Sequence, residues 1–427
     1  MTKNGSQHPD SKLQLPWNVA QFGALILPLM PPLGVISLSL ALLITWAFKY
    51  KTIINRPINW GFGIFCSLLI ITTIFAQDKI PALLGLPNFL PFVLLFSAFN
   101  ILIQTTAQLR RLAWILVITS IPVSVIGFGQ MFLGLKTPEL FLNIFGWVVA
   151  SGGNPPGRMA SVFMYANVLA GYLVIVFILA CGLSLEKITE NKKVERETLF
   201  LTVAVILNFA ALILTNSRNA WLIAIFACVA YAFFLGWRLI VGFFAGVTAS
   251  VLLAAFAPAP VAGVFRSFVP AFFWARLNDQ MFPDRPVALM RTTQWQFAWS
   301  MTQQRPLTGW GLRNFTPLYQ QKMHIWLGHP HNFFLMLSAE TGLPNTLLFI
   351  GLIAWILMAS LRMLRQSIYS EQDKLILFSY FLVVIAWVIF NTVDVSLFDL
   401  RLNTLSWLLL GAVSGVSYHQ NKQYQKF

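Results

Sequence analysis

Long apolar stretches separated by short polar segments dominate this chain. Mostly apolar runs of about 18 to 25 residues recur along it, the length that a helix needs to cross a bilayer. We predict spans at 18–32, 33–48, 60–76, 86–103, 112–133, 160–184, 198–215, 219–236, 238–257, 344–361, 375–394 and 400–418. The pattern therefore predicts an all-α polytopic membrane protein with about twelve transmembrane helices.

The longest segment between spans lies between the ninth and the tenth. We divide the chain into an N-terminal tail (1–17), spans one to nine (18–257), a long external loop with surface helices (258–343), spans ten to twelve (344–418) and a C-terminal tail (419–427). The first residues are polar and lack a signal-peptide pattern, so we expect the first span to be retained. Pro31, Pro32 and Gly34 predict a tight hairpin between the first two spans.

The basic residues predict an orientation in the membrane. The formal net charge is +15, with 29 basic residues, and seventeen of these fall in loops on the side of the two termini. The positive-inside rule therefore places both termini in the cytoplasm, and the charge distribution needs no nucleic-acid partner. Long external loops are exempt from the rule. Seven basic residues lie there: Arg266, Arg276, Arg285, Arg291, Arg305, Arg313 and Lys322. This excess of cations on the outer face suggests an anionic ligand.

The external loop is rich in aromatic residues and partly helical by pattern. Residues 291–301 have helical spacing, with Trp295, Ala298 and Trp299 on one face. That face is more often core or membrane contact than a sugar platform. We expect the loop to lie on the membrane surface. Two other external loops bring Arg158 and Arg218 to the same side.

Polar chemistry concentrates where the loop meets span ten. His329, His331, Asn332 and Glu340 lie within a few turns of one another. A straight helix would place Glu340 about 13 Å from His331 along the axis and on the opposite face. Because Gly342 and Pro344 offer a break, we expect a short surface helix over 331–340 and an interfacial Glu340 close to the basic loop.

These residues predict an external site for a phosphorylated lipid. Its members are Arg158, Arg218, Arg291, His329 and His331, with Asn332 and Glu340 nearby. Arginine presents a planar fork that matches phosphate oxygens, and histidine can act as a general base at neutral pH. The set suffices to displace a polyprenyl diphosphate from the anomeric carbon of a sugar.

Other chemistries lack support in the sequence. No phosphate-binding glycine loop and no D-x-D pair are present. The spacing of His329, His331 and Glu340 is not a common zinc pattern, and no G-x-S-x-G motif supports a serine hydrolase. Three isolated cysteines form no framework. We therefore expect no metal and no cofactor.

Each candidate also has a structural interpretation. Arg158 and Arg218 could be plain interfacial anchors, and Arg291 could pair with Asp279 or Asp284. A further group, Asp394, Asp399 and Arg401, could form a local salt bridge or join the site through Asp399; the sequence leaves both possibilities open.

Four motifs in order resemble the O-antigen ligase and polymerase superfamily of bacterial inner-membrane proteins. They are GRMASVFMYANVLAGY at 157–172, LTNSRNAW at 214–221, RTTQW at 291–295 followed by RPLTGWG at 305–311, and His331-Asn332 with ETG at 340–342. The chain departs from the usual pattern at Asn219 and at Tyr165-Ala166, although Asn167 keeps its place. The stretch 318–321 is similar to cyanobacterial members.

The resemblance implies a GT-C-like membrane glycosyltransferase with a periplasmic active site. It implies metal-independent transfer of a glycan from undecaprenyl diphosphate to a lipid A core, glycan or protein acceptor. Arg218 and Arg291 would grip the diphosphate and His331 would act on the acceptor hydroxyl. Arg158, Asn167, His329, Asn332 and Glu340 are the expected substrate-binding residues.

Three alternatives remain at this stage. A polymerase of the same superfamily uses the same donor and differs in the acceptor. A bicarbonate or other anion transporter could use the same arginines, but it needs ionisable residues at mid-span, and the predicted spans contain almost none. A scaffold that only recruits other glycan enzymes would not need the arginines and histidines.

Overall fold

The computed structural model describes residues 8, 10–189, 196–277, 286–367 and 369–424, and these residues form helices and no strand. Nine helices in this part of the chain are long and apolar enough to cross a membrane. They are α2 (Pro31–Ile54), α3 (Pro57–Ile74), the segment Lys79–Leu102 with α4 (Lys79–Gly85) and α5 (Leu90–Leu102), α6 (Thr106–Phe132), α8 (Ala166–Thr189), α9 (Arg196–Leu214), α11 (Arg238–Phe256), α16 (Phe333–Leu364) and α17 (Glu371–Asn391). The described part of the chain is thus all-helical, and the protein is a multi-pass membrane protein.

The three other predicted spans are also helical but fall outside this group. They are α1 (Gln14–Ile26), α10 (Arg218–Phe234) and α18 (Leu400–Tyr424), of which the first two have 13 and 17 residues. A total of twelve spans therefore stays a prediction. The hairpin between the first two helices is confirmed, because α1 ends at Ile26 and α2 begins with two prolines, which suit the first turn of a helix.

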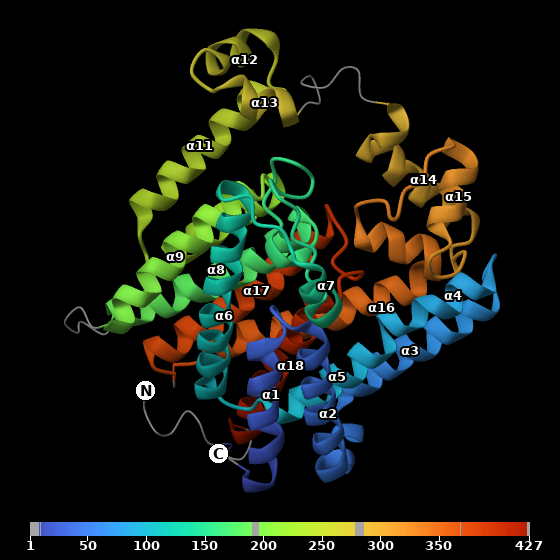
Figure 1. The fold of residues 1–427 in the computed structure, drawn as a ribbon, viewed down its shortest axis with the longest axis vertical. Helices are drawn as coiled ribbons and strands as arrows, with labels where there is room; N and C mark the ends of the chain where they lie inside the picture. The colour runs from blue at the N-terminus through green and yellow to red at the C-terminus, as the bar shows by residue number, and fades with distance from the viewer. Residues whose placement is uncertain (1–7, 9, 190–195, 278–285, 368, 425–427) are drawn as a thin grey trace. The chain divides into compact units, whose positions relative to one another are not determined.

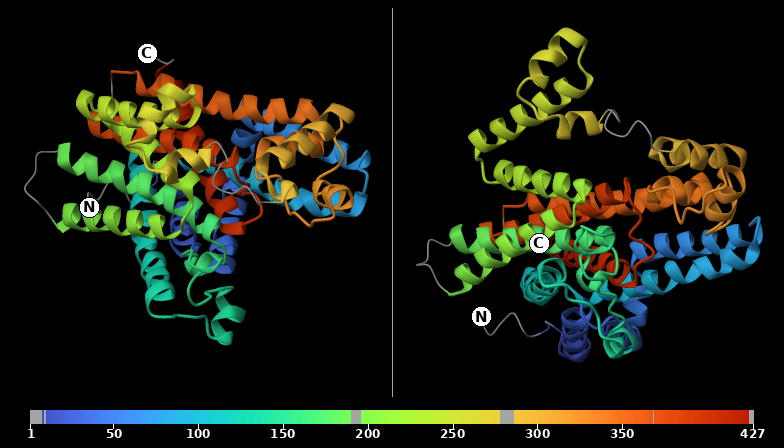
Figure 2. Two further views of the ribbon diagram at one scale, coloured as in Figure 1. Left: turned by 90° about the horizontal axis from the view of Figure 1, so that it is seen from above. Right: turned by 45° about the horizontal axis from the view of Figure 1, so that its top comes forward.

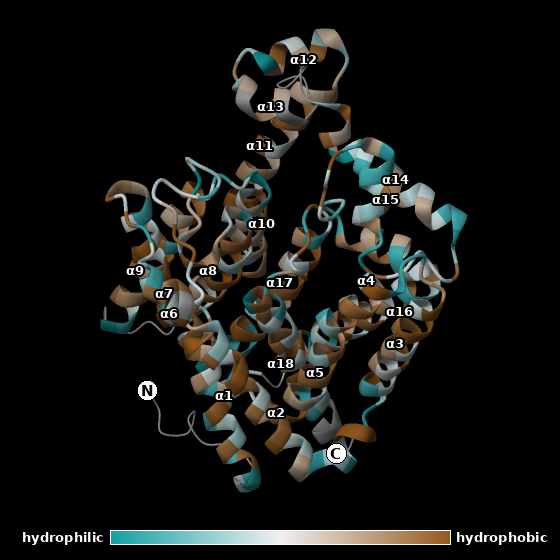
Figure 3. Cartoon of the chain, turned by 45° about the vertical axis from the view of Figure 1, so that its right-hand side comes forward, coloured by the Kyte–Doolittle hydropathy of each residue, from teal (hydrophilic) through white to brown (hydrophobic). Residues whose placement is uncertain are grey.

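The chain divides into two compact units, residues 1–223 with 297–427 and residues 224–296. In the first unit, α18 packs against α5, α16 and α17, and α8 packs against α6, α9 and α17 (Figures 1 and 2). Aromatic side chains fill the contact around α18: Trp407 packs edge-on against Phe62 and Phe349. Outer helices such as α3 remain largely hydrophobic on their surfaces (Figure 3), as expected for helices that face lipid.

The second unit contains most of α10, then α11, α12 (Ala259–Arg266), α13 (Ala271–Leu277) and the start of α14 (Arg291–Gln304). Arg266 holds its short helices together. Its Nε donates to the carbonyl of Ala254, 2.7 Å away, and its guanidinium lies 4.2 Å from the ring centroid of Trp274. Asp279 and Asp284, considered above as partners of Arg291, lie outside the described residues.

The predicted helix over 291–301 is confirmed as α14. In the first unit Phe297, Ala298 and Met301 are buried, whereas Trp299 is 45% exposed. These three pack with Phe315 and Tyr319 of α15 (Phe315–Met323) and with Ala339. A tight three-helix contact accommodates alanine at its centre and leaves the larger indole outside.

The predicted break after residue 340 is confirmed at Gly342, where φ is +80° inside α16. A Cβ atom there would lie 2.4 Å from the carbonyl oxygen of Leu307, so glycine is required by both conformation and space. Glu340 is only 3% exposed. It does face the external loop as expected, but from inside the protein: its Oε1 accepts from the N–H of Phe315, 3.2 Å away at the start of α15.

Candidate functional site

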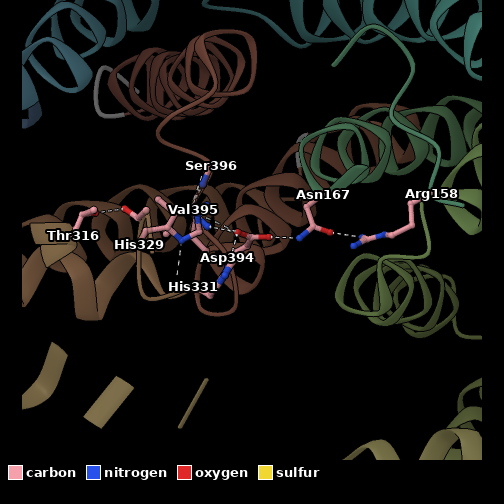
Figure 4. Close-up of polar contacts among 10 residues, drawn as sticks. Arg158, Asn167, Thr316, His329, His331, Asp394, Val395 and Ser396 are labelled. Atoms are coloured by element: carbon pink, nitrogen blue, oxygen red, sulfur yellow. Dashed lines mark hydrogen bonds and ion pairs between the residues drawn. The ribbon is translucent and has the colours of Figure 1, made fainter. Parts of the chain in front are cut away.

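A continuous line of polar contacts connects side chains from three distant parts of the chain. Figure 4 shows Asp394 between Asn167 and His331. Asn167 Nδ2 donates to Asp394 Oδ2 at 2.8 Å, and Asn167 Oδ1 accepts from Arg158 Nη2 at 2.5 Å. On the other side of the carboxylate, His331 Nδ1 lies 3.5 Å and His329 Nε2 lies 4.0 Å from Asp394 Oδ1. The structure therefore brings four predicted residues together through one aspartate.

Helix ends place these side chains. Asn167 lies in the first turn of α8, Asp394 follows the end of α17, and His331 precedes α16. Asn332 is the N-cap of α16, because its side chain accepts from the N–H of Leu335 at 3.0 Å. Polar residues are favoured at such ends because they satisfy the unpaired backbone groups there. Packing of the helices then collects three ends in one place.

Arg158 also holds the turn that precedes Arg218. Its Nε donates to the carbonyl oxygen of Thr215 at 2.9 Å. In the same turn Asn216 adopts a left-handed conformation with φ +51°, and Arg218 begins α10 with its side chain exposed. The guanidinium of Arg158 thus connects the Asp394 carboxylate, through Asn167, to the backbone that carries Arg218.

The carboxylate of Asp394 is buried and has several donors. Its Oδ1 also accepts from the N–H of Val395 at 2.9 Å. Burial alone would raise the pKa of Asp394, but the hydrogen bond from His331 and the charges of both imidazoles outweigh burial and hold this pKa below its usual value. Asp394 is therefore an anion at neutral pH.

The hydrogen bonds indicate where the imidazole protons lie. The backbone N–H of His331 donates to His329 Nδ1 at 3.2 Å, so this ring nitrogen of His329 is an acceptor. His331 Nδ1 faces the anionic carboxylate and is the nitrogen that carries the proton. The Nε2 atom of His331 then keeps its lone pair, on a side chain that is 31% exposed. This arrangement suits a base that accepts a proton from outside.

His331 has an uncommon backbone conformation, with φ +51°. For a residue other than glycine this costs on the order of 1 kcal/mol, and such strain concentrates at functional sites. The neighbouring ring of His329 lies at a centroid distance of 4.5 Å, edge to face, and stacks on Phe398 at 5.9 Å. Packing therefore holds both imidazoles in place.

His329, His331 and Asp394 also form the one described group whose donor atoms could hold a metal ion, since these atoms lie within 4.8 Å of one another. The hydrogen bond to His329 Nδ1 argues against this use. Because Nδ1 of His329 accepts this hydrogen bond, the proton of the neutral imidazole is on Nε2, the atom that faces Asp394. A nitrogen that binds a metal ion needs a free lone pair, which a protonated Nε2 does not have. The geometry fits a hydrogen-bonded set better than a coordination sphere.

Among the predicted residues of the first unit, Glu340 makes its contacts away from this line. Glu340 contacts the start of α15 and, through its own carbonyl, the N–H of Gly311 at 2.8 Å. Arg291 begins α14 in the second unit, so its role stays a prediction. Arg305, which the sequence analysis did not include in the site, donates to the carbonyl of Phe75 and stacks on Trp310.

Sequence reasoning did not assign Asp394 to the site. It left open whether Asp394, Asp399 and Arg401 form a local salt bridge or join the site through Asp399. The structure shows Asp399 paired locally with Arg401, with Oδ2 and Nη2 3.4 Å apart, and Asp394 in the polar line. The available signal was its position just after an apolar run, on the same predicted side as the arginines.

The family model described as O-antigen ligase matches residues 203–350. No curated protein matches the chain. The matched residues include Arg218, Arg291 and His331, whereas Arg158, Asn167 and Asp394 lie outside them.

Proposed function

We propose that this chain, which the O-antigen ligase family model matches over residues 203–350, transfers a glycan from a polyprenyl diphosphate to an acceptor hydroxyl. The donor is undecaprenyl-diphosphate-linked, and the acceptor is a lipid A core, another glycan or a protein. The protein lies in the bacterial inner membrane with both termini cytoplasmic and the site on the periplasmic face. The observation that supports this proposal most is the partly exposed imidazole of His331, with its Nδ1 facing the Asp394 carboxylate.

His331 is the general base in this proposal. Its Nε2 takes the proton of the acceptor hydroxyl while the hydroxyl oxygen bonds to the anomeric carbon. The bond between that carbon and the diphosphate oxygen breaks, and its electron pair leaves with the diphosphate. Asp394 stabilises the imidazolium that forms and keeps the ring oriented. Since the donor already carries a good leaving group, the reaction needs no metal or cofactor.

Arg218 and Arg291 bind the diphosphate and stabilise the charge that develops on it. Charge-assisted hydrogen bonds from arginine to phosphate oxygens are about twice as strong as neutral ones. Arg158 and Asn167 contribute through the turn before Arg218 and through Asp394. Asn332 caps the start of α16 beside His331, and the ring of His329 packs against that of His331. Glu340 accepts a hydrogen bond from the start of α15 and so holds the external loop in place.

A matched pair of variants tests the base. His331 and His324 are both histidines with left-handed backbone, at φ +51° and +58°, and His324 is an exposed C-cap residue of α15. Asparagine tolerates this conformation, so His331→Asn and His324→Asn impose the same change on the backbone. In nanodiscs with a lipid-linked glycan and acceptor, we expect His331→Asn to abolish release of undecaprenyl diphosphate and His324→Asn to retain it. Retained release by His331→Asn would refute the assignment.

A further inference from the structure

A groove lies between α14 and α15 in the first unit, in the external loop. Its volume is about 210 Å³. The groove is lined by residues that include Phe297, Ser300 and Gln304 of α14, Trp310 of the connecting turn, and Gln321 and Lys322 of α15. None of these belongs to the polar line around Asp394. Figure 3 shows that α14 and α15 carry many hydrophilic residues, unlike the neighbouring α3.

The floor of the groove is a packed aromatic cluster. The ring centroid of Phe297 lies 5.7 Å from that of Phe315 and 5.1 Å from that of Tyr319, both nearly perpendicular. The indole N–H of Trp310 donates to the carbonyl of Met301 at 2.9 Å. Because every ring is held by a neighbour, the groove is preformed, and a ligand need not order its floor on binding.

The rim is polar and suits a polyhydroxylated ligand. Gln304 and Gln321 are exposed, and a carboxamide both donates and accepts, so it can pair with two neighbouring hydroxyl groups of one sugar ring. Ser300 adds a hydroxyl. The aromatic floor complements the C–H face of a pyranose, whereas a lipid chain could form no hydrogen bond with the amides.

The charge of the rim favours a ligand that is neutral or acidic. No lining residue of the groove is acidic. The ammonium of Lys322 lies 5.4 Å from the ring centroid of Phe297, over the floor. A sugar bound there would place its substituents near this cation, so an acidic sugar unit would gain a favourable contact.

We propose that this groove binds a glycan chain at a unit remote from the one that reacts. The proposal rests on the transferase function above and adds a second subsite, which would favour long glycans over single repeat units. Binding remote units raises the occupancy of the site without touching the reacting atoms.

The test uses two double variants in full-length protein in nanodiscs. Gln304→Ala with Gln321→Ala removes both amides of the groove. The control, Gln303→Ala with Gln320→Ala, makes the same changes one position earlier in the same helices, at exposed residues that do not line the groove. The probe is a fluorescently labelled length ladder of oligosaccharides released by mild acid from the host cell's surface polysaccharide.

We expect the groove variant to bind the longer oligosaccharides about tenfold more weakly than wild type, as loss of two modest hydrogen bonds implies. The control should bind like wild type, and transfer from a single-repeat donor should be unchanged in both. Equal binding by wild type and both variants, or equal losses in both variants, would overturn the proposal. If binding behaves as expected but no protein transfers glycan, the transferase function fails and the glycan site stands.

Discussion

Replacing Asp394 with asparagine tests the structural account of the base at a residue that does not touch substrate. The substitution keeps the shape and one hydrogen-bonding oxygen for Asn167, but it removes the negative charge 3.5 Å from His331 Nδ1. Two unit charges about 4 Å apart attract by about 4 kcal/mol at an effective dielectric constant near 20. Since the His331 side chain is 31% exposed, solvent screening reduces this to about half.

A loss of about 2 kcal/mol of transition-state stabilisation corresponds to a fall in kcat of about 30-fold. We expect KM for the lipid-linked donor to change little, because Asp394 stabilises the imidazolium that forms in the reaction and not the bound substrate. The assay is release of undecaprenyl diphosphate by the purified variant at saturating donor and acceptor.

The control is Asp399→Asn. Asp399 lies on the same loop and caps α18 by accepting from the N–H of Leu402 at 2.9 Å, a role that asparagine also fills. It should retain kcat within about twofold. If Asp394→Asn also retains wild-type kcat, or if both variants lose activity equally, the carboxylate does not act on His331 and the reasoning is refuted.

Three further predictions concern stability and the arrangement of the arginines. The folded-state pKa of Asp394 lies below its usual value. The contribution of this carboxylate to stability is therefore present above about pH 4 and is lost as the pH falls through the folded-state pKa. When thermal unfolding is measured from pH 7 to pH 3, the decrease in Tm should be smaller for Asp394→Asn than for wild type. Gly342→Ala places a Cβ atom 2.4 Å from a backbone oxygen at φ +80° and should cost at least about 1–3 kcal/mol, measured as a lower Tm, whereas Gly351→Ala, with open space around it, should not. Arg158→Lys replaces the guanidinium, which reaches both Thr215 and Asn167, with a single ammonium group. We expect kcat/KM to fall about tenfold, because about one charge-assisted hydrogen bond is lost. An unchanged kcat/KM would show that the link to the turn of Arg218 is dispensable.

The helices could be predicted from the sequence because membrane spans are set by length and apolarity. Every predicted span overlaps a helix, and the prolines at the start of α2 and Gly342 in α16 marked a turn and a break correctly. These are local effects of residues that restrict or extend backbone freedom. Sidedness and the number of spans depend on the membrane and stay predictions.

The packing of side chains was harder to predict. Helical spacing placed Trp295, Ala298 and Trp299 on one face of α14 but did not say which of them is buried. The buried positions are those that allow α14 to approach α15 and α16 closely. Helical spacing alone does not say how near the partner helix lies. The same limit applied to Glu340, whose buried position depends on α15 covering it.

The site was predicted in part. Arg158, His329 and His331 are polar residues at the predicted boundaries of apolar runs, and this could be read from the chain, whereas Asn167 was expected from the family resemblance. Their connection through Asp394 could not, because it joins residues 63 and 227 positions apart. It arises only when the ends of α8, α16 and α17 come together.

The central claim is most directly tested by a mass balance on purified wild-type protein. The donor is an undecaprenyl-diphosphate-linked glycan with a radiolabelled sugar, supplied in nanodiscs with extracted acceptors and a chelator. We predict that released undecaprenyl diphosphate and labelled acceptor appear in equal amounts and that the chelator has no effect. Folded protein that releases no undecaprenyl diphosphate with any acceptor, yet carries bicarbonate or another anion into liposomes, would contradict the account.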